Sequence, residues 1–179
     1  GEMECWGECL YGECLSDPGP WAHIGTSNHL TCAVNYQGEL SCWGIETTFQ
    51  DDNYVIAASG NNNYDTYGCA VTESAVVCWG SDFNNNVTHA PFGEYDFLSL
   101  GGAHSCAIDF NGVASCWGNC VLGQCGSCIV TECTLEGGPY ISIAAGNSHT
   151  CAVDGAGVAF CLGQDSHGKV SGAPGNSNP

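Results

Sequence analysis

Cysteine is the residue type with which this sequence could do the most chemistry. The chain has 15 cysteines in 179 residues. Cysteine at that density is typical of a disulfide scaffold in an oxidising compartment, because cytosolic thiols are kept reduced. Two alternatives stay open for one group of four, which could bind zinc as a tetrathiolate or, through Cys125-Gly-Ser-Cys128, carry out redox exchange. That group is Cys120, Cys125, Cys128 and Cys133.

The cysteines follow a repeat. The string Cys-Trp-Gly begins at Cys5, Cys42, Cys78 and Cys116, and a fifth copy is altered to Cys161-Leu-Gly. Successive copies are 37, 36, 38 and 45 residues apart. Four copies are preceded by Cys-Ala-Val or Cys-Ala-Ile, and before that by a short apolar stretch that ends in a turn. Short strands with Gly and Asn turns at this period predict an all-β propeller or β-solenoid.

Hairpin geometry predicts four disulfides. Cys106 and Cys116 lie ten residues apart around a three-residue loop, Phe110-Asn-Gly112, with glycine in the left-handed position. Three steps back along each strand, the cysteines form a non-hydrogen-bonded pair with Cα atoms about 4.5 Å apart, which a disulfide tolerates. In the second repeat the cysteine spacing is nine and the loop is two residues long, so the cysteines stay opposite each other. The expected pairs are Cys32–Cys42, Cys69–Cys78, Cys106–Cys116 and Cys151–Cys161.

Equal spacing predicts three further disulfides, which lie in loops. These pairs are Cys9–Cys14, Cys120–Cys125 and Cys128–Cys133. Cys5 is then left over. By the spacing of the other hairpins its partner stands before Gly1, and the alternative is an intermolecular bond. On either interpretation the chain is not self-contained.

The repeat blocks resemble a known family. Gly101-Gly-Ala-His-Ser-Cys-Ala-Ile-Asp-Phe-Asn-Gly-Val-Ala-Ser-Cys-Trp-Gly118 resembles the repeats of the regulator-of-chromosome-condensation family, and the likeness covers residues 1–163. The paired cysteines are most similar to its extracellular branches, the ectodomains of plant crinkly-type receptor kinases and secreted bacterial repeat proteins. The resemblance implies a propeller with four-stranded blades, seven in a full ring. This chain holds about four and a half short blades with disulfide-stapled hairpins, which make an incomplete ring.

The repeats define the expected domain organisation. A propeller-like repeat domain spans residues 1–163, and a Gly/Ser/Asn/Pro tail or linker spans 164–179. The repeat domain divides into a partial unit, 1–20, and the units 21–53, 54–94, 95–138 and 139–163.

The charge excludes several partners. Lys169 is the one basic residue against 19 acidic ones, which gives a net charge of −18. This charge repels nucleic-acid phosphates and anionic membrane surfaces, and the chain has no arginine for nucleosome contacts. No apolar run is long enough for a transmembrane helix, so we expect neither nucleic-acid binding nor membrane insertion. Bound cations or a partner with basic groups would relieve the self-repulsion.

Other side chains suggest smaller sites. The oxygen-rich loops that contain Asp51, Asp52 and Asp82 are weak calcium candidates without EF-hand spacing, and we expect no other cofactor. Asn86-Val-Thr88 is a glycosylation sequon, which predicts an exposed, glycosylated Asn86 if the source is eukaryotic.

Histidine and tryptophan also recur. His104 and His149, two residues before a hairpin cysteine, could bind a metal, but a structural role is favoured because the position belongs to the repeat. One tryptophan per unit could stack on glycans, but packing between adjacent blades is the expected role. These residues are Trp6, Trp43, Trp79 and Trp117.

No nucleophile–base–acid constellation is present, so we expect no enzymatic activity. The favoured function is a structural or assembly module of a secreted or cell-surface filament, because an open blade edge is a template for another chain. Residues 1–14 are expected to pair with another copy or with preceding sequence, and Cys5 to bond outside residues 6–179. The alternative is a ligand-binding ectodomain, directed to protein or glycan through loops on one propeller face.

Overall fold

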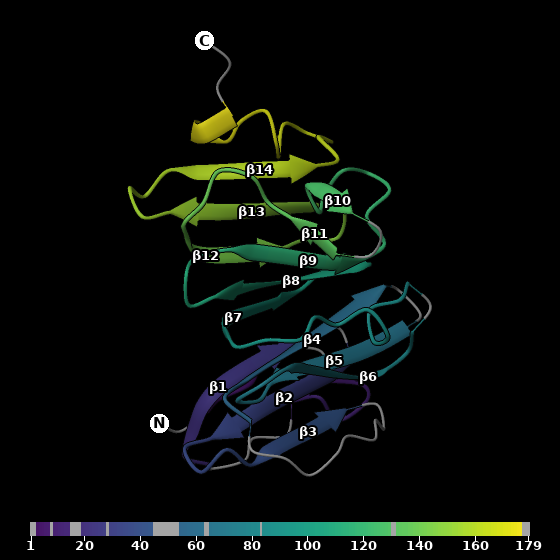
Figure 1. The fold of residues 1–179 in the computed structure, drawn as a ribbon. Coiled ribbons are helices and arrows are strands. Elements are labelled where there is room, and N and C mark those ends of the chain that lie inside the picture. Colours follow the sequence, from purple (N-terminus) through teal and green to yellow (C-terminus); the bar gives the residue numbers. More distant parts are fainter. Residues whose placement is uncertain are drawn as a thin grey trace.

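The computed structural model describes residues 3–7, 9–14, 19–27, 29–44, 54–62, 65–82, 84–129 and 132–176. Within these residues the chain forms β-strands and one short 3-10 helix, and the strands make four antiparallel sheets (Figure 1). None of the described helical structure is long and apolar enough to cross a membrane. The all-β prediction is therefore confirmed.

Each of the four full units forms one sheet. The first contains β1 (Trp21–Thr26), β2 (Leu30–Asn35) and β3 (Leu40–Gly44), and the second contains β4 (Ile56–Asn62), β5 (Asp65–Val71) and β6 (Val76–Gly80). The third begins with β7 (Tyr95–Leu100), β8 (His104–Asp109) and β9 (Ala114–Gly118). The fourth contains β12 (Tyr140–Ala145), β13 (His149–Asp154) and β14 (Ala159–Gly163).

The third sheet has two additional strands. The insertion that lengthens this unit folds as a hairpin of β10 (Ser127–Ile129) and β11 (Glu132–Thr134), and β11 pairs with the outer edge of β9. The resemblance implies four-stranded blades. Among the described residues, the other three units form three strands each, and only this unit extends its sheet outward.

Side-chain caps hold the hairpin turns. In the third unit the Asp109 carboxylate accepts hydrogen bonds from the backbone N–H groups of Asn111 and Val113, at 2.9 and 2.8 Å. Gly112 follows with a φ of 81°, in the left-handed region that glycine adopts without strain. The same Asx turn occurs at Asn35 and Asp154. A polar side chain therefore fixes the turn, and the turn fixes the register of the cysteines behind it.

The sheets stack through their first strands. β1 packs against β4, β4 against β7, and β7 against β12, which is the arrangement of the innermost strands in a propeller. The first and last sheets lie at opposite ends of the stack (Figure 1). Apolar clusters fill the seams between units: Trp79 packs with Leu30 and Val34 at one seam, and Trp117 with Tyr67 and Val71 at the next.

Part of the expected C-terminal tail packs on the last sheet. The 3-10 helix Pro174–Asn176 lies against β14. The Asn176 side chain accepts a hydrogen bond from the Cys161 backbone N–H at 2.8 Å and donates one to the Cys161 carbonyl. Because both polar groups of a β14 residue are satisfied in this way, the outer edge of the last sheet is partly covered.

Candidate functional site

The structure joins six of the seven expected disulfide pairs. In the four hairpins the bonded cysteines face each other with Cα atoms 4.1 Å apart. Cys133 is also disulfide-bonded and stands opposite Cys128 across the β10–β11 hairpin, but the Cys128 side chain lies outside the described residues. The six pairs are Cys9–Cys14, Cys32–Cys42, Cys69–Cys78, Cys106–Cys116, Cys120–Cys125 and Cys151–Cys161.

Three sulfur atoms gather beside the third sheet. Those of Cys120, Cys125 and Cys133 all lie within 4.8 Å of one another. All three cysteines are disulfide-bonded, whereas zinc binds deprotonated thiols. In this oxidised form the cluster is a covalent staple for the insertion and offers no thiolate ligands.

Among the described residues, the loop that follows a Cys-Trp-Gly or Cys-Leu-Gly string is closed in one of two ways. In the third unit the Cys120–Cys125 disulfide starts two residues after Gly118 and spans five residues. At the same offsets in the second unit, Asp82 Oδ1 accepts hydrogen bonds from the backbone N–H groups of Val87 and Thr88, at 2.8 and 3.1 Å. A covalent bond and a side-chain cap are therefore alternative closures of the same loop.

Of the four such loops that the structure describes, two are closed by caps and two by disulfides. Asp165 of the fourth unit caps Val170 and Ser171 as Asp82 caps its own loop, at 2.7 and 3.0 Å. The partial unit uses the Cys9–Cys14 disulfide. Sequence reasoning found the disulfides and missed the caps, although an aspartate two residues after the glycine was a readable signal.

The cap gives Asp82 a role other than calcium binding. Burial raises the pKa of this carboxyl, but hydrogen bonds from the Val87 and Thr88 backbone outweigh it, and the net pKa lies below the ordinary value. Converging N–H groups suit an anion and do not supply oxygen ligands to a cation. Asp51 and Asp52 lie outside the described residues.

Asn86 lies at the seam between the second and third units. Its side chain is only 2% exposed, and its backbone carbonyl accepts a hydrogen bond from the Trp117 indole N–H at 2.8 Å. The expectation of an exposed Asn86 is wrong, because this loop position, six residues after the glycine, turns inward. Gln124 and Glu13 occupy the same position in other loops and are buried too. This burial disfavours a glycan on Asn86, because a bulky sugar must leave the protein surface.

Matching polar contacts bridge the two C-terminal seams. The Tyr67 hydroxyl lies 3.0 Å from Ser105 Oγ of the next unit, and His104 Nε2 lies 2.7 Å from Thr150 Oγ1 of the unit after that. Burial, and secondarily the charge of His149, lowers the pKa of His104 to about 4. The bond to Thr150 therefore joins the third and fourth units inside this buried seam.

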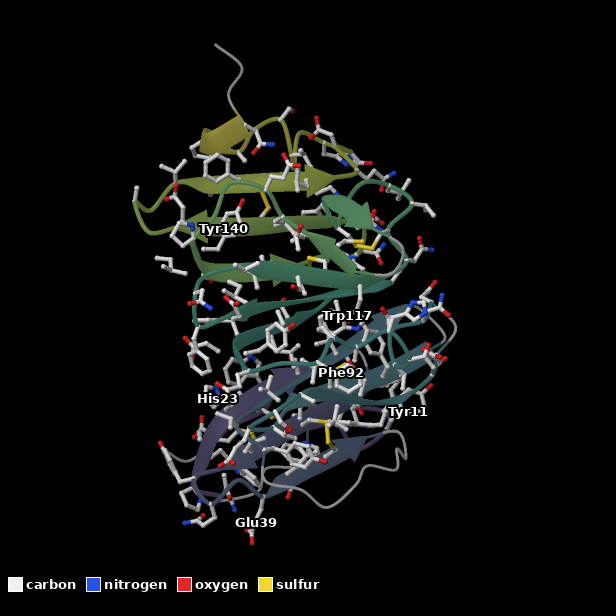
Figure 2. The ribbon with its side chains drawn as sticks, viewed as in Figure 1. Tyr11, His23, Glu39, Phe92, Trp117 and Tyr140 are labelled. Atoms are coloured by element: carbon white, nitrogen blue, oxygen red, sulfur yellow. A yellow bond between two sulfur atoms is a disulfide. The ribbon has the colours of Figure 1, made fainter. Side chains whose placement is uncertain are left out.

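Tryptophan burial changes along the chain. Trp117 is 1% exposed and Trp79 is 6% exposed, each packed against the unit before it, and Figure 2 shows Trp117 between the second and third sheets. Trp43 is half-buried. Trp6, the equivalent residue of the partial unit, is 85% exposed. The indole therefore packs between blades wherever a described blade precedes it.

Cys5 and Trp6 border a hollow beside the first sheet. The hollow has a volume of about 390 Å³ and includes Ile24 and Thr31 in its lining. Cys5 carries a free thiol. The Thr31 hydroxyl donates a hydrogen bond to the Glu13 carbonyl at 2.8 Å, so the N-terminal loop is attached to the first sheet at the place of a preceding blade.

A second hollow follows the innermost strands. It has a volume of about 490 Å³ and is lined by residues of β1, β4 and β7. Ile24 and Phe97 remain 47% and 41% exposed in this region. In a closed propeller these strands line the central channel, whereas the four sheets described here leave it open on one side.

Solved structures share this arrangement. The ectodomain of the receptor kinase CR4 from Physcomitrella patens matches with a TM-score of 0.69 and 25% identity over 90% of this chain. The CRINKLY WD40 ectodomain of the Arabidopsis thaliana receptor kinase ACR4 matches with a TM-score of 0.57 and 23% identity over 78% of the chain. Prp20p from Saccharomyces cerevisiae, described with its binding to Gsp1p and histones, matches with a TM-score of 0.68 and 18% identity over 80% of the chain.

The chain has an RCC1-like β-propeller fold. It spans about half the length of these structures: 46% of the CR4 chain, 48% of the ACR4 chain and 43% of the Prp20p chain. No family profile matches the sequence, and no curated protein matches it significantly. The disulfides and the two receptor ectodomains point to an extracellular location for this RCC1-like chain.

Proposed function

We propose that this chain is a non-catalytic extracellular assembly module, one part of a larger propeller. Its N-terminal half unit is completed by strands of preceding sequence or of another copy. The observation that carries the proposal is the state of one Cys-Trp-Gly copy: Cys5 has a free thiol and Trp6 is 85% exposed.

The complete units define what is missing around these two residues. In each of them the cysteine bonds to a cysteine on the middle strand of its own unit, as Cys116 bonds to Cys106. In the second and third units the tryptophan packs against the preceding unit, as Trp117 packs on Tyr67. By analogy, Cys5 would bond to a cysteine on a middle strand of its own unit, and Trp6 would pack against the sheet of a preceding unit.

The surface around this segment supports a specific contact. An exposed indole removes a large apolar area from water when it is covered, and tryptophan is common among residues that dominate interface energies. The charge of −18 opposes indiscriminate association between copies. A completed interface would then be centred on Trp6 with the acidic groups at its rim.

A ligand-binding ectodomain is the second candidate. The inner hollow of about 490 Å³, with Ile24 and Phe97 partly exposed, favours it, and CR4 and ACR4 are receptor kinase ectodomains. The two functions are compatible, since a completed propeller would still present loops on one face to a ligand.

Grafting tests the proposal. Residues 95–113, which supply an inner strand, a middle strand and a turn, would be joined directly before Met3. The graft's copy of Cys106 then stands ten residues ahead of Cys5, as Cys106 stands ahead of Cys116.

We expect the graft to form a disulfide with Cys5, to protect it from alkylation and to raise the melting temperature. A graft with serine in place of its cysteine is the control for the covalent bond. Continued alkylation of Cys5 in the grafted chain, with an unchanged melting temperature, would contradict the proposal.

A further inference from the structure

A third hollow lies at the turn end of the seam between the second and third units. It has a volume of about 440 Å³, within the range of side-chain and small-ligand pockets. It is separate from the N-terminal segment of the assembly proposal. Its lining consists of Val55, Val71, Thr72, Glu73, Glu94, Tyr95, Asp96 and Phe110.

A shortened turn accounts for this hollow. At the flanking seams the three-residue turn reaches the first residue of the next unit: the N–H of Tyr54 donates to the Gly38 carbonyl, and that of Tyr140 to the Gly112 carbonyl, at 2.9 and 2.8 Å. At the middle seam the turn is one residue shorter, and the Ser74 carbonyl accepts instead from Gly93 at 3.1 Å. The shorter turn stops two residues before Tyr95, and space remains in front of that ring.

The carboxylates of this hollow have no partner among the described residues. Within the part of the chain that the structure describes, Glu73, Glu94 and Asp96 accept no side-chain hydrogen bond and form no ion pair. Six carboxylates elsewhere in the fold each accept at least one hydrogen bond within the chain: Glu13, Glu39, Asp82, Asp109, Asp154 and Asp165. The three acids at the hollow are therefore available to a partner.

Apolar and aromatic surface lies beside these acids. Phe110 is 67% exposed and Val55 is 48% exposed, while Tyr95 and Val71 form a buried floor. Phe92, two residues before Glu94, is 90% exposed. Exposed apolar surface of this kind is unfavourable in free energy unless a partner covers it.

We infer that this hollow binds an arginine side chain of a basic segment on a partner protein. A guanidinium is weakly hydrated, pairs with carboxylates through several donors and stacks on aromatic rings, so it matches both parts of the lining. A calcium ion would instead require six or more oxygen ligands and no aromatic wall. Charge complementarity points to another protein, because the chain itself offers a single cation, Lys169, and a net charge of −18.

Peptide titration of the full chain tests the inference. The probes are acetyl-Leu-Arg-Leu-amide and its neutral isostere, acetyl-Leu-citrulline-Leu-amide, followed by amide chemical shifts in NMR at low salt. We expect the arginine peptide to shift Glu73, Tyr95 and Asp96, and the citrulline peptide to bind at least about tenfold more weakly. The double variant Glu73→Gln/Glu94→Gln loses binding to a similar extent.

Matched controls come from the first unit. Glu39→Gln removes an exposed carboxylate at the equivalent hairpin, and Tyr36→Ser removes an exposed aromatic ring at the turn position of Phe110. Both are expected to keep full affinity, whereas Phe110→Ser weakens it.

Three outcomes would overturn the inference. The first is equal binding of the two peptides, and the second is unchanged affinity in the double variant. The third concerns the chain without peptide: the same amide signals would shift with protein concentration, and these shifts would vanish in Lys169→Gln. That result would assign the hollow to a second copy of this chain.

Discussion

The indole N–H of Trp117 donates a hydrogen bond to the backbone carbonyl of Asn86, 2.8 Å away, across the boundary between two repeat units. Trp117 comes from the third sheet and Asn86 from the loop that leaves the second. Both residues are almost fully buried, so the contact locks one unit onto the next in a place that water does not reach.

We predict that Trp117→Phe destabilises the chain by about 1–3 kcal/mol, because the Asn86 carbonyl loses its donor while the ring is largely retained. Denaturant unfolding with disulfides intact measures the change. Trp6→Phe is the matched control, since Trp6 is 85% exposed, and should stay within about 0.5 kcal/mol of wild type. Equal effects of the two substitutions would show that the seam bond adds nothing.

Asn86 should carry no glycan even when the chain is secreted by a eukaryotic cell. Its side chain is 2% exposed, and a sugar on it would have to pass through the packed seam beside Trp117. Intact-mass analysis of the peptide that contains Asn86 checks this. A glycan at high occupancy on folded protein would mean that the loop adopts another conformation.

The correct predictions from the sequence rest on the spacing of residues within one repeat unit. Cys106 and Cys116 could be paired from the loop length alone, because a hairpin turn fixes which residues face each other, and the structure places their Cα atoms 4.1 Å apart. The Gly-containing turns, and the strand order within each unit, follow from the same local rules.

Contacts between units could not be derived in this way. The Asn86 sequon looks like an exposed polar loop, and only the packing of the next unit on that loop buries it. The hollow near Tyr95 likewise depends on how far the preceding turn reaches across the seam. The loop caps at Asp82 and Asp165 are local, but an aspartate in a polar loop does not by itself distinguish a cap from a solvated side chain.

His104 should make stability depend on pH. Its folded pKa is about 4 and its unfolded value about 6.5, so the unfolded chain binds the proton more readily. Stability is therefore full above about pH 6.5 and declines as the pH falls toward 4, by roughly 3 kcal/mol at most from this group. Urea midpoints between pH 4 and 8 measure the decline.

A His104→Gln variant should lose most of that decline, since glutamine does not titrate and keeps a group able to bond to Thr150 Oγ1. His23→Gln, on the exposed side of β1, is the control and should leave the pH profile unchanged. The same slope in His104→Gln as in wild type would assign the pH dependence to other groups.

The two loop closures should be interchangeable. Asp82→Ala frees the backbone N–H groups of Val87 and Thr88 and should cost about 0.5–1 kcal/mol, as the loss of an exposed cap does. Asp82→Cys combined with Val87→Cys should restore or exceed wild-type stability by the five-residue staple seen at Cys120–Cys125. Thermal unfolding under oxidising conditions compares the wild type, Asp82→Ala and the double-cysteine variant. If the double variant forms the disulfide but is less stable than Asp82→Ala, the loops of the second and third units differ in shape.

We propose that the Cys5–Trp6 half unit is completed from outside residues 6–179. The most direct test is disulfide mapping of Cys5 by mass spectrometry of the intact natural protein, digested without reduction after thiol blocking. We expect Cys5 to be bonded to a cysteine of preceding sequence or of another copy. A blocked, unbonded Cys5 in folded natural protein, together with a Trp6 that remains accessible to oxidation, would contradict it.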